Sequence, residues 1–498
     1  IQFKNMKKLY TIVSLMLSSL SIMATDFKDC SMAIKSNIST NIEKSNTTVF
    51  INGNTFSING LKYDNTDLGN VELTNLQVIN GYSDGTMVYA TSEPQYITIG
   101  GEKVAVNFRG EVRNRKFRGI LNLTINGSNY IAMIGDKADE LGQLPNAGFE
   151  NFHDDASGTK EPNGWHSFKT CAGSLSGTAG KANNTFIEST EKHSGANSVK
   201  VQSDILKVLG FSKPANGTMT TGRLYAGNTS ATNKANNSTM DFADKGKDGN
   251  GDPFYPIFTT KPDALTVWVK FKGNVKEHPY ATVKAILAND RVQDPEKDDY
   301  KKNVIARAAN AQIESKNFAW QELNIPFEYA NKNTPKGVLV TISTNAEAGK
   351  ASSNKSNLDV IYVDDIAMIY NSGLKSAQYK NTNLSFADNK AAIEIEGKAN
   401  EADFSIASDG EGAYISKVLK TNEGETGKST LYITITSNDL QKSNCFEVAI
   451  TDKTATGIFN IKSDSNATSS TLYNLAGQQV SNSYKGIIIK NGKKYINK

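Results

Sequence analysis

The stretch ALTVWVKF, residues 264–271, decides the fold class of this chain. In an extended strand successive side chains point to opposite faces, so Val267, Val269 and Phe271 would share one face. Trp268 and Lys270 would share the other. An apolar set at alternate positions is typical of a strand that buries one face against a second layer of structure. The stretch therefore predicts a β-sheet that carries Trp268 and Lys270 on its outer face.

The same alternation recurs on both sides of this stretch. Residues 46–137 contain several such runs, for example LNLTI at 121–125, and residues 383–452 contain others, such as LYITI at 431–435. Asn-Gly pairs, which favour tight hairpin turns, stand at 52–53, 59–60, 80–81 and 126–127. A meander of short strands must bury one face, so we expect residues 46–137 to form a closed or nearly closed barrel.

Length, charge and cysteine content bound the class of protein. At 498 residues the chain is too long for one hydrophobic core, and several domains are expected. Its 55 basic and 51 acidic residues leave a formal charge of +4, so electrostatics give no reason to expect a nucleic-acid partner. The three cysteines, Cys30, Cys171 and Cys445, are far apart and odd in number. We therefore expect neither a disulfide framework nor a cysteine zinc site.

Residues 1–25 have the features of a signal peptide. Met6 is followed by Lys7 and Lys8, and then by a short apolar run that ends at the small residue Ala24. A positive start, a short apolar centre and a small residue before the cleavage point are typical of exported proteins. We therefore expect a secreted or cell-surface protein, with no transmembrane span left after the signal peptide is removed.

Five landmarks in the middle of the chain occur in a fixed order. They are NAGFE at 146–150, PNGW at 162–165, TGRL at 221–224, WQELNIP at 320–326 and LDVIYVDDI at 358–366. In this order they resemble the carbohydrate metabolism domain family (PCMD) of exported gut-bacterial proteins, over residues 145–371. The resemblance implies a jelly-roll β-sandwich and a role with carbohydrate, but it does not name a reaction.

Three weaker resemblances cover the flanking regions. LGNVEL at 68–73 and GTMV at 85–88, with the strand at 117–125, are similar to a calycin-like β-barrel domain of exported proteins. Residues 383–452 resemble the small immunoglobulin-like sandwich that often follows the PCMD domain. The tail, residues 456–498, resembles a C-terminal secretion-sorting domain. The fold expected for the whole chain is therefore all-β: a calycin-like barrel, a jelly roll, an immunoglobulin-like sandwich and a β tail.

Acidic residues at the two ends of the jelly-roll region are candidate metal ligands. The first and last strands of a jelly roll commonly pair, which would bring Glu150 towards Asp364 and Asp365. Calcium takes six to eight oxygen ligands, so we expect a structural Ca²⁺ site there. The alternative is that Glu150 caps a turn and the two aspartates are solvated. The run DGNGD at 248–252 also places acids at alternate positions. Pro253 stands where an EF-hand needs glycine, however, so we expect only a turn.

Aromatic residues are the candidates for sugar binding. Trp268 is the favoured platform, because aromatic faces stack on the apolar faces of sugars, and Lys270 shares its side of the strand. Tyr255 and Tyr280 stand near loops and are expected to rim the same groove. The alternative for each is ordinary packing, which is what we expect of the two remaining tryptophans, Trp165 and Trp320.

Catalytic signals are weak. Adjacent acids such as Asp298-Asp299 would point to opposite faces of a strand and so do not form a carboxylate pair. The four histidines, His153, His166, His193 and His278, show no metalloprotease spacing. We therefore predict a secreted or surface accessory protein that engages a polysaccharide, and lean against an enzyme. One alternative is a glycoside hydrolase with a carboxylate pair on the concave face of the jelly roll, and another is an adhesin or structural surface protein.

Overall fold

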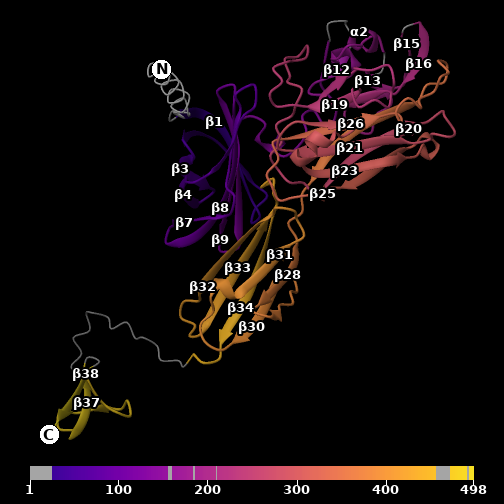
Figure 1. Ribbon diagram of the computed structural model, residues 1–498. Helices are drawn as coiled ribbons and strands as arrows, with labels where there is room; N and C mark the ends of the chain where they lie inside the picture. Colours follow the sequence, from indigo (N-terminus) through magenta and orange to yellow (C-terminus); the bar gives the residue numbers. More distant parts are fainter. Residues whose placement is uncertain are drawn as a thin grey trace, which may run out of the picture.

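The computed structural model describes residues 25–154, 160–182, 185–208, 210–455, 471–490 and 493–497. The predicted signal peptide therefore lies outside the described residues, apart from its last position. Strands dominate the described chain, and its helices are short, the longest spanning Asp298–Asn303 (Figure 1). The prediction of an all-β fold is confirmed.

The first region is one curled sheet of ten strands in the order β4-β3-β2-β1-β10-β9-β8-β6-β5, with β7 also paired to β8. Its strands are β1 (Thr25–Ser36), β2 (Ile42–Asn52), β3 (Thr55–Tyr63), β4 (Thr66–Leu73), β5 (Gln77–Ile79), β6 (Met87–Ala90), β7 (Gln95–Ile99), β8 (Glu102–Arg113), β9 (Lys116–Ile125) and β10 (Ser128–Ile134). The sheet thus begins at Thr25 rather than at residue 46. Its two end strands, β4 and β5, are not paired with each other, so the sheet curls into a half-barrel and does not close.

The second region is a sandwich of two five-stranded sheets. One sheet has the order β13-β14-β27-β20-β24, which we call the outer sheet, and the other has the order β17-β26-β21-β23-β25. The strands of the outer sheet are β13 (Thr185–Glu188), β14 (Ser198–Gln202), β20 (Ala264–Lys272), β24 (Trp320–Pro326) and β27 (Val360–Ile369). Those of the second sheet are β17 (Thr218–Thr220), β21 (Ala281–Ala288), β23 (Val304–Ile313), β25 (Glu328–Tyr329) and β26 (Gly337–Ser343).

The core of this sandwich lies between the two sheets. Val267, Val269 and Phe271 are fully buried in it, as the alternation in β20 predicts. The opposite face of the second sheet is covered as well, because Ile286 and Leu339 pack in a separate apolar cluster. That cluster is completed by the first region and by a three-stranded sheet of β18 (Arg223–Tyr225), β19 (Asn237–Met240) and β22 (Val292–Asp294). Only the outer sheet therefore presents a sheet face that these small elements leave accessible.

Two hairpins complete the second region. They are β11 (Phe152–Asp154) with β12 (Lys160–Pro162), and β15 (Asp204–Val208) with β16 (Phe211–Ala215). The first hairpin lies close to the start of the domain and to the short helix Phe168–Thr170. It contributes two side chains to the buried group described below.

The third region is a smaller sandwich. A three-stranded sheet, β29-β28-β31, faces a four-stranded sheet, β30-β34-β33-β32, across one apolar core. Its strands are β28 (Leu374–Tyr379), β29 (Thr382–Asn383), β30 (Lys390–Ile395), β31 (Phe404–Ser408), β32 (Tyr414–Thr421), β33 (Lys428–Thr436) and β34 (Ser443–Asp452). The sandwich starts at Leu374 rather than at residue 383. A separate sheet in the tail contains β35 (Leu472–Asn474), β36 (Gln479–Val480), β37 (Gly486–Lys490) and β38 (Lys493–Asn497).

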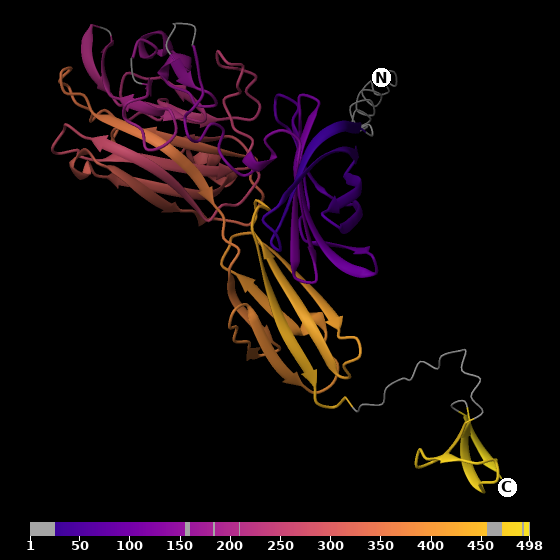
Figure 2. The ribbon, with the colours of Figure 1, turned by 180° about the vertical axis from the view of Figure 1, so that it is seen from behind.

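The first three regions meet at one junction, which both ribbon views show (Figures 1 and 2). The buried Arg109 donates from Nη1 to the carbonyl oxygen of Thr259 at 2.8 Å, which links the half-barrel to the large sandwich. The hydroxyl of Tyr414 donates to the carbonyl oxygen of Thr91 at 3.0 Å, which links the small sandwich to the half-barrel.

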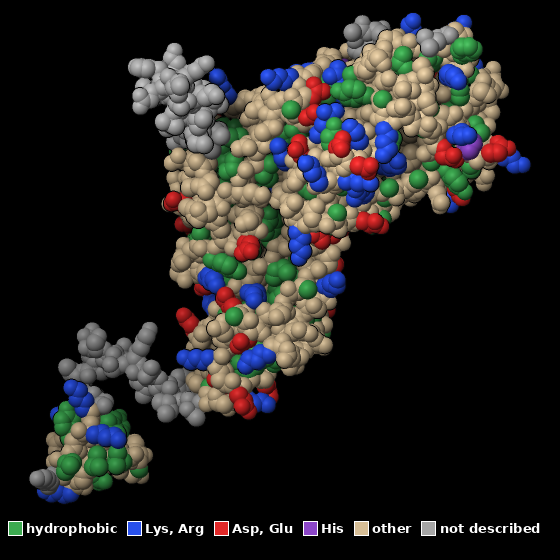
Figure 3. Space-filling view, viewed as in Figure 1, with side chains coloured by type: hydrophobic (Ala, Val, Ile, Leu, Met, Phe, Trp, Pro, Cys, Tyr) green, Lys and Arg blue, Asp and Glu red, His purple; other side chains and the backbone are tan. Residues whose placement is uncertain are grey.

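On the face seen in Figure 3, acidic and basic side chains are interspersed, as the small net charge would suggest.

Candidate functional site

The outer sheet carries an in-register row of aromatic and basic side chains on the face away from the core. Phe186 pairs with Lys200, Lys200 with Tyr362, Tyr362 with Lys270, and Lys270 with Trp320. All five residues are half-buried. Because partners directly opposite on neighbouring strands stand on the same face, the five side chains cross the whole sheet as one line. We call this line the aromatic row.

Trp268 lies beside the aromatic row, one step further along β20. It is half-buried and faces away from the core, as the sequence predicts. The ring of His193 stacks on the indole, with the ring centroids 3.7 Å apart and the planes only 11° from parallel. His193 also meets Trp320 edge-on at 6.2 Å. One face of the predicted platform is therefore already covered by a side chain of the protein itself.

Lys270 is held by two neighbours. Its ammonium group forms an ion pair with Glu191 at 2.6 Å and lies over the ring of Phe318 at 4.5 Å. Phe318 in turn contacts Tyr362, with the ring centroids 5.8 Å apart. Only 14% of the Lys270 side chain is exposed, so this lysine fixes the arrangement of the row more than it reaches into solvent.

The four other aromatic predictions have different outcomes. Tyr255 is 1% exposed and packs against Tyr82 of the half-barrel, so the prediction that it rims a groove is wrong. A loop position in the sequence did not reveal that a second domain covers this residue. Tyr280 precedes β21, which belongs to the other sheet, so it does not share a strand face with Trp268. Trp165 is fully buried, as expected, whereas Trp320 is half-buried on the outer face rather than in the core.

The three predicted calcium ligands are brought to one place. Glu150 lies just after the opening segment of the domain, and Asp364 and Asp365 lie in β27. The N–H of Ile366 donates to the carbonyl oxygen of Ala147 at 3.0 Å, which joins the opening segment to this strand. All three acids contact the loop of residues 193–196, so we call them the acid group.

Backbone N–H groups of that loop bind the acid group. Asp364 Oδ2 accepts hydrogen bonds from the N–H groups of His193 and Ser194 at 2.8 and 3.2 Å. Glu150 Oε1 accepts one from Ala196 at 2.9 Å. Asp364 is fully buried, and burial raises the pKa of its carboxyl although the N–H groups favour the charged form. These two acids therefore position the loop that places His193 on Trp268.

Asp365 completes the acid group from a strained backbone. Its φ of 45° lies in the left-handed region, which is unusual for a residue with a side chain. Asp365 Oδ2 pairs with His193 Nδ1 at 2.7 Å, and its Oδ1 accepts the hydroxyl of Ser194 at 2.9 Å. The imidazole is thereby fixed in the orientation in which it stacks on the indole.

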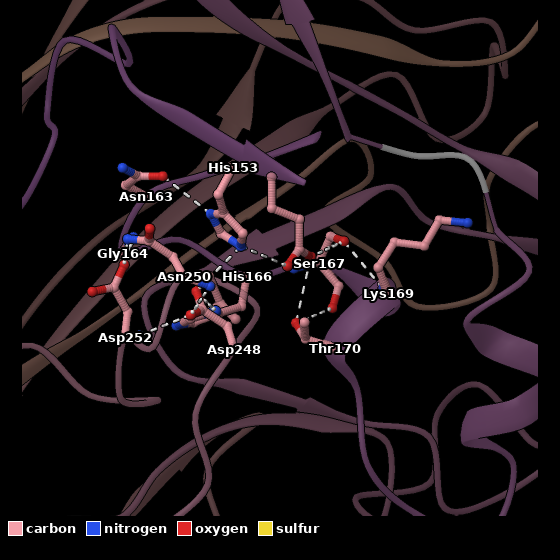
Figure 4. Close-up of polar contacts among 12 residues, drawn as sticks. His153, Asn163, Gly164, His166, Ser167, Lys169, Thr170, Asp248, Asn250 and Asp252 are labelled. Carbon is pink, nitrogen blue, oxygen red and sulfur yellow. Dashed lines mark hydrogen bonds and ion pairs between the residues drawn. The ribbon is translucent and has the colours of Figure 1, made fainter. Parts of the chain in front are cut away.

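A second polar group lies inside the domain, and sequence reasoning did not find it. It contains His153 on β11, Glu161 opposite it on β12, His166, and Asp248 from the DGNGD turn. Figure 4 shows both histidines directed towards Asp248. We call these four residues the buried histidine group.

The distances within the buried histidine group are short. Asp248 Oδ2 is 3.5 Å from His153 Nε2 and 3.6 Å from His166 Nδ1. Glu161 Oε2 is 4.0 Å from His153 Nε2. Three of the four side chains are completely shielded from solvent, and that of His153 is 8% exposed. Four polar groups therefore share one enclosed site.

The remaining atoms of the histidine–glutamate pair are well bonded. His153 Nδ1 lies 3.1 Å from the side-chain oxygen of Asn163, to which it can only act as donor. Glu161 Oε1 accepts the N–H of Ser167 at 2.8 Å. These bonds fix how the two side chains point into the site.

Asp248 is positioned by its own turn. Its Oδ1 accepts the N–H groups of Asn250 and Asp252 at 2.9 and 2.8 Å, so the DGNGD run forms the predicted turn. The turn uses only one of the two carboxylate oxygens. The other, Oδ2, is thereby directed at the two histidines.

Four polar atoms on the two histidines and Asp248 have no hydrogen-bond partner within the described part of the chain: His153 Nε2, His166 Nδ1 and Nε2, and Asp248 Oδ2. Leaving a buried polar atom unpaired costs about 1–3 kcal/mol. Burial lowers the pKa of His166 to about 4, so at neutral pH its imidazole is uncharged. Burial likewise raises the pKa of the Asp248 carboxyl. These unpaired buried atoms therefore lower the stability of the folded protein.

No pattern of spacing in the sequence marks this group. His153 and Glu161 meet through a hairpin register, whereas Asp248 arrives from a turn far along the chain. The DGNGD run is the one feature of the sequence that could have indicated this group, but by itself it predicts only a turn. Its second carboxylate oxygen acquires a role only when the turn packs beside the hairpin.

Comparison with known proteins does not add a relative. No family model matches the sequence, and no curated protein matches it either. Within the described ranges, no helix has the length and apolar character needed to cross a bilayer. The functional argument therefore rests on the geometry above.

Proposed function

We propose that this protein is a secreted or surface-displayed accessory protein that binds a polysaccharide on the outer sheet of its large sandwich. The observation that carries the proposal is the aromatic row, in which rings and ammonium groups alternate in register across five strands. Pyranose rings stack on aromatic faces through their C–H groups, and their hydroxyls bind charged and amide groups. A line of half-buried rings across a sheet suits an extended chain of sugars.

The row also limits where a sugar would stack. His193 covers one face of Trp268, so the indole of Trp268 acts mainly as the support of the loop above it. Trp320 and Tyr362 lie at the row itself, on either side of Lys270. We therefore assign the principal stacking contacts to Trp320 and Tyr362, with Trp268 holding the adjacent loop in place.

Binding is favoured over hydrolysis by the state of the nearest acids. Cleavage of a glycosidic bond needs two carboxyl groups placed on either side of it. Asp364, which pairs with Trp268 across the strands, is buried and accepts hydrogen bonds from the backbone. Two of the acids beside the row are thus already engaged, Asp364 by the loop and Glu191 by Lys270, while Glu322 opposite Trp268 is exposed. We therefore favour a binding protein over a glycoside hydrolase or a mere spacer.

Calcium remains our proposal for the acid group. Glu150 and Asp365 offer hard oxygen atoms near the surface, which is the ligand type that Ca²⁺ prefers. The ion would have to displace hydrogen bonds that these oxygens already accept, so we propose a weak, structural site of the kind found in extracellular modules.

The proposal is tested by affinity electrophoresis of the whole chain through gels that contain different polysaccharides. We expect retardation in at least one gel. Trp320→Ala and Tyr362→Ala should each lose most of this retardation, because a few aromatic residues usually supply most of the binding energy of an interface. Tyr280→Ala, which removes an exposed tyrosine outside the row, is the matched control and should migrate like the native chain. Equal retardation of all three variants would show that the sugar is bound elsewhere.

A further inference from the structure

The buried histidine group has the composition of a metal-binding site. We propose that His153 Nε2, His166 Nδ1 and Asp248 Oδ2, joined by Glu161, bind one divalent transition-metal ion of the zinc class. This site is distinct from the acid group at the surface and from the aromatic row. The proposal does not depend on carbohydrate binding.

The hydrogen bonding around the site determines which atoms carry free electron pairs. Because His153 Nδ1 can only donate to the side-chain oxygen of Asn163, the neutral ring presents a lone pair at Nε2. A metal-bound histidine usually shows this arrangement, in which the second ring nitrogen donates to a neighbouring oxygen. That lone pair faces the carboxylate oxygen of Asp248 at 3.5 Å. A nitrogen lone pair and a carboxylate oxygen repel each other inside a protein, and a cation between them would remove this repulsion.

A simple hydrogen-bonded cluster does not account for the distances. Hydrogen bonds between nitrogen and oxygen are usually 2.7–3.2 Å long. The two histidine nitrogens lie 3.5 and 3.6 Å from Asp248 Oδ2, and Glu161 Oε2 lies 4.0 Å from His153 Nε2. These atoms are therefore too far apart for ordinary hydrogen bonds to one another, although Asp248 Oδ2 faces both histidine nitrogens.

The spacing is close to that of a four-coordinate ion. With metal–ligand bonds of 2.0–2.2 Å, neighbouring ligands in a tetrahedron are about 3.3–3.6 Å apart. Two of the measured separations fall in this range, and the third exceeds it by about 0.4 Å, judged against the same bond lengths. As the side chains of the described residues stand, no three acidic, histidine or cysteine groups are arranged so that they could hold a metal ion, so binding requires side-chain rotation in this group. A small rotation of Glu161 would close this group.

The donor types select the ion. Two imidazole nitrogens with one or two carboxylates suit zinc and neighbouring transition metals, whereas calcium and magnesium prefer oxygen ligands alone. Four protein ligands and nearly complete shielding from solvent correspond to a closed, structural site rather than to a catalytic one. The ion would fasten the β11–β12 hairpin and His166 to the DGNGD turn.

The first experiment measures stoichiometry and coordination in the native chain. The whole chain is stripped with a chelator, dialysed, and titrated with Zn²⁺ and, separately, with Co²⁺. We expect one tightly bound zinc ion per chain, and a strong visible Co²⁺ spectrum of the four-coordinate type that is displaced by zinc. A weak spectrum typical of six-coordinate Co²⁺, or binding of much less than one equivalent, would overturn the proposal without any variant being made.

The second experiment uses matched variants. Asp248→Asn keeps the oxygen that accepts the turn's N–H bonds but replaces the metal-facing oxygen by an amide, so we expect it to fold and to bind zinc at least about 100-fold more weakly. Asp252→Asn alters the same turn but leaves all four proposed ligands in place. Because the Asp252 carboxylate interacts electrostatically with His166 and Asp248, we expect a loss of affinity of less than about tenfold. The two substitutions differ only in which end of one turn they change.

Surface histidines provide the remaining control. His193 and His278 are the other two histidines of the chain, and both are partly exposed. The double variant His193→Gln, His278→Gln should still bind one zinc ion per chain. If this variant loses the ion while Asp248→Asn keeps it, the ion is an adventitious surface ligand and the proposal is wrong.

Discussion

The acid group and the buried histidine group are built from similar side chains, but they differ in how far the protein itself satisfies them. In the acid group, Asp364 and Glu150 accept N–H bonds from one loop, and Asp365 is paired with His193. In the interior, Asp248 uses one oxygen for its own turn and directs the other at two histidine nitrogens without bonding to them. An aspartate therefore positions a loop in the acid group, whereas in the buried histidine group an aspartate offers an oxygen to a metal ion.

This difference shows how to separate structural acids from ligand-binding ones. An acid whose oxygens already accept hydrogen bonds gains little from an ion, because the ion must replace bonds that exist. A buried acid that faces lone pairs gains much, because a cation removes both the unpaired oxygen and the repulsion. The number of acids at each site is a poor guide, since the surface group has three and the buried group two.

The largest effect on stability is expected from Asp364→Asn. The substitution would place an amide NH₂ or a single oxygen where one buried carboxylate oxygen accepts the N–H groups of His193 and Ser194. Loss of these two bonds should lower the free energy of unfolding by about 3 kcal/mol, measured by urea denaturation at neutral pH. A loss below about 1 kcal/mol would mean that the acid group does not hold the loop.

The next largest effect is expected from Trp268→Ala. The indole supports the ring of His193, which the acid group holds from the other side. Removing the ring should cost about 2 kcal/mol in the same assay, from lost stacking and lost packing on β20. Tyr280→Ala should cost less than about 0.5 kcal/mol, as is usual for an exposed side chain. Equal costs for the two variants would show that Trp268 is not part of the loop's support.

Calcium should have a smaller effect than either substitution. With a dissociation constant of about 1 mM, in the range of extracellular modules, 10 mM Ca²⁺ would stabilise the chain by about 1.4 kcal/mol. Glu150→Gln, which keeps an oxygen that can accept the N–H of Ala196, should abolish most of this gain. A midpoint of thermal unfolding that does not move with Ca²⁺ would remove calcium from the acid group.

The smallest effect is expected from Asp248→Asn in the presence of a metal chelator. Here the substitution removes a buried charge, and the new NH₂ group can donate to a histidine nitrogen that has no partner. The free energy of unfolding should therefore change by less than about 1 kcal/mol. The same change of Asp to Asn thus costs much where the carboxylate accepts backbone N–H groups, as at Asp364, and little in the metal-free histidine group. A loss as large as that of Asp364→Asn would erase the distinction between the two groups.

The alternation of side chains predicted part of the candidate site correctly and part of it wrongly. Trp268 and Lys270 were placed on the right face because strand geometry is local and needs only the sequence of β20. Tyr255 was misplaced because its burial depends on Tyr82 in another domain. The start of the half-barrel was missed because β1 is rich in polar residues and its pairing with β2 shifts register between Phe27 and Cys30.

The sequence alone determined that this chain is built of strands and which side chains of β20 face outward, because these properties follow from a two-residue period and from turn residues. Only the tertiary structure decided which outward side chains are free, covered or enclosed. His153 meets Asp248 through a hairpin on one side and a distant turn on the other. Such a meeting depends on how separate elements pack, and no local pattern of residues encodes it.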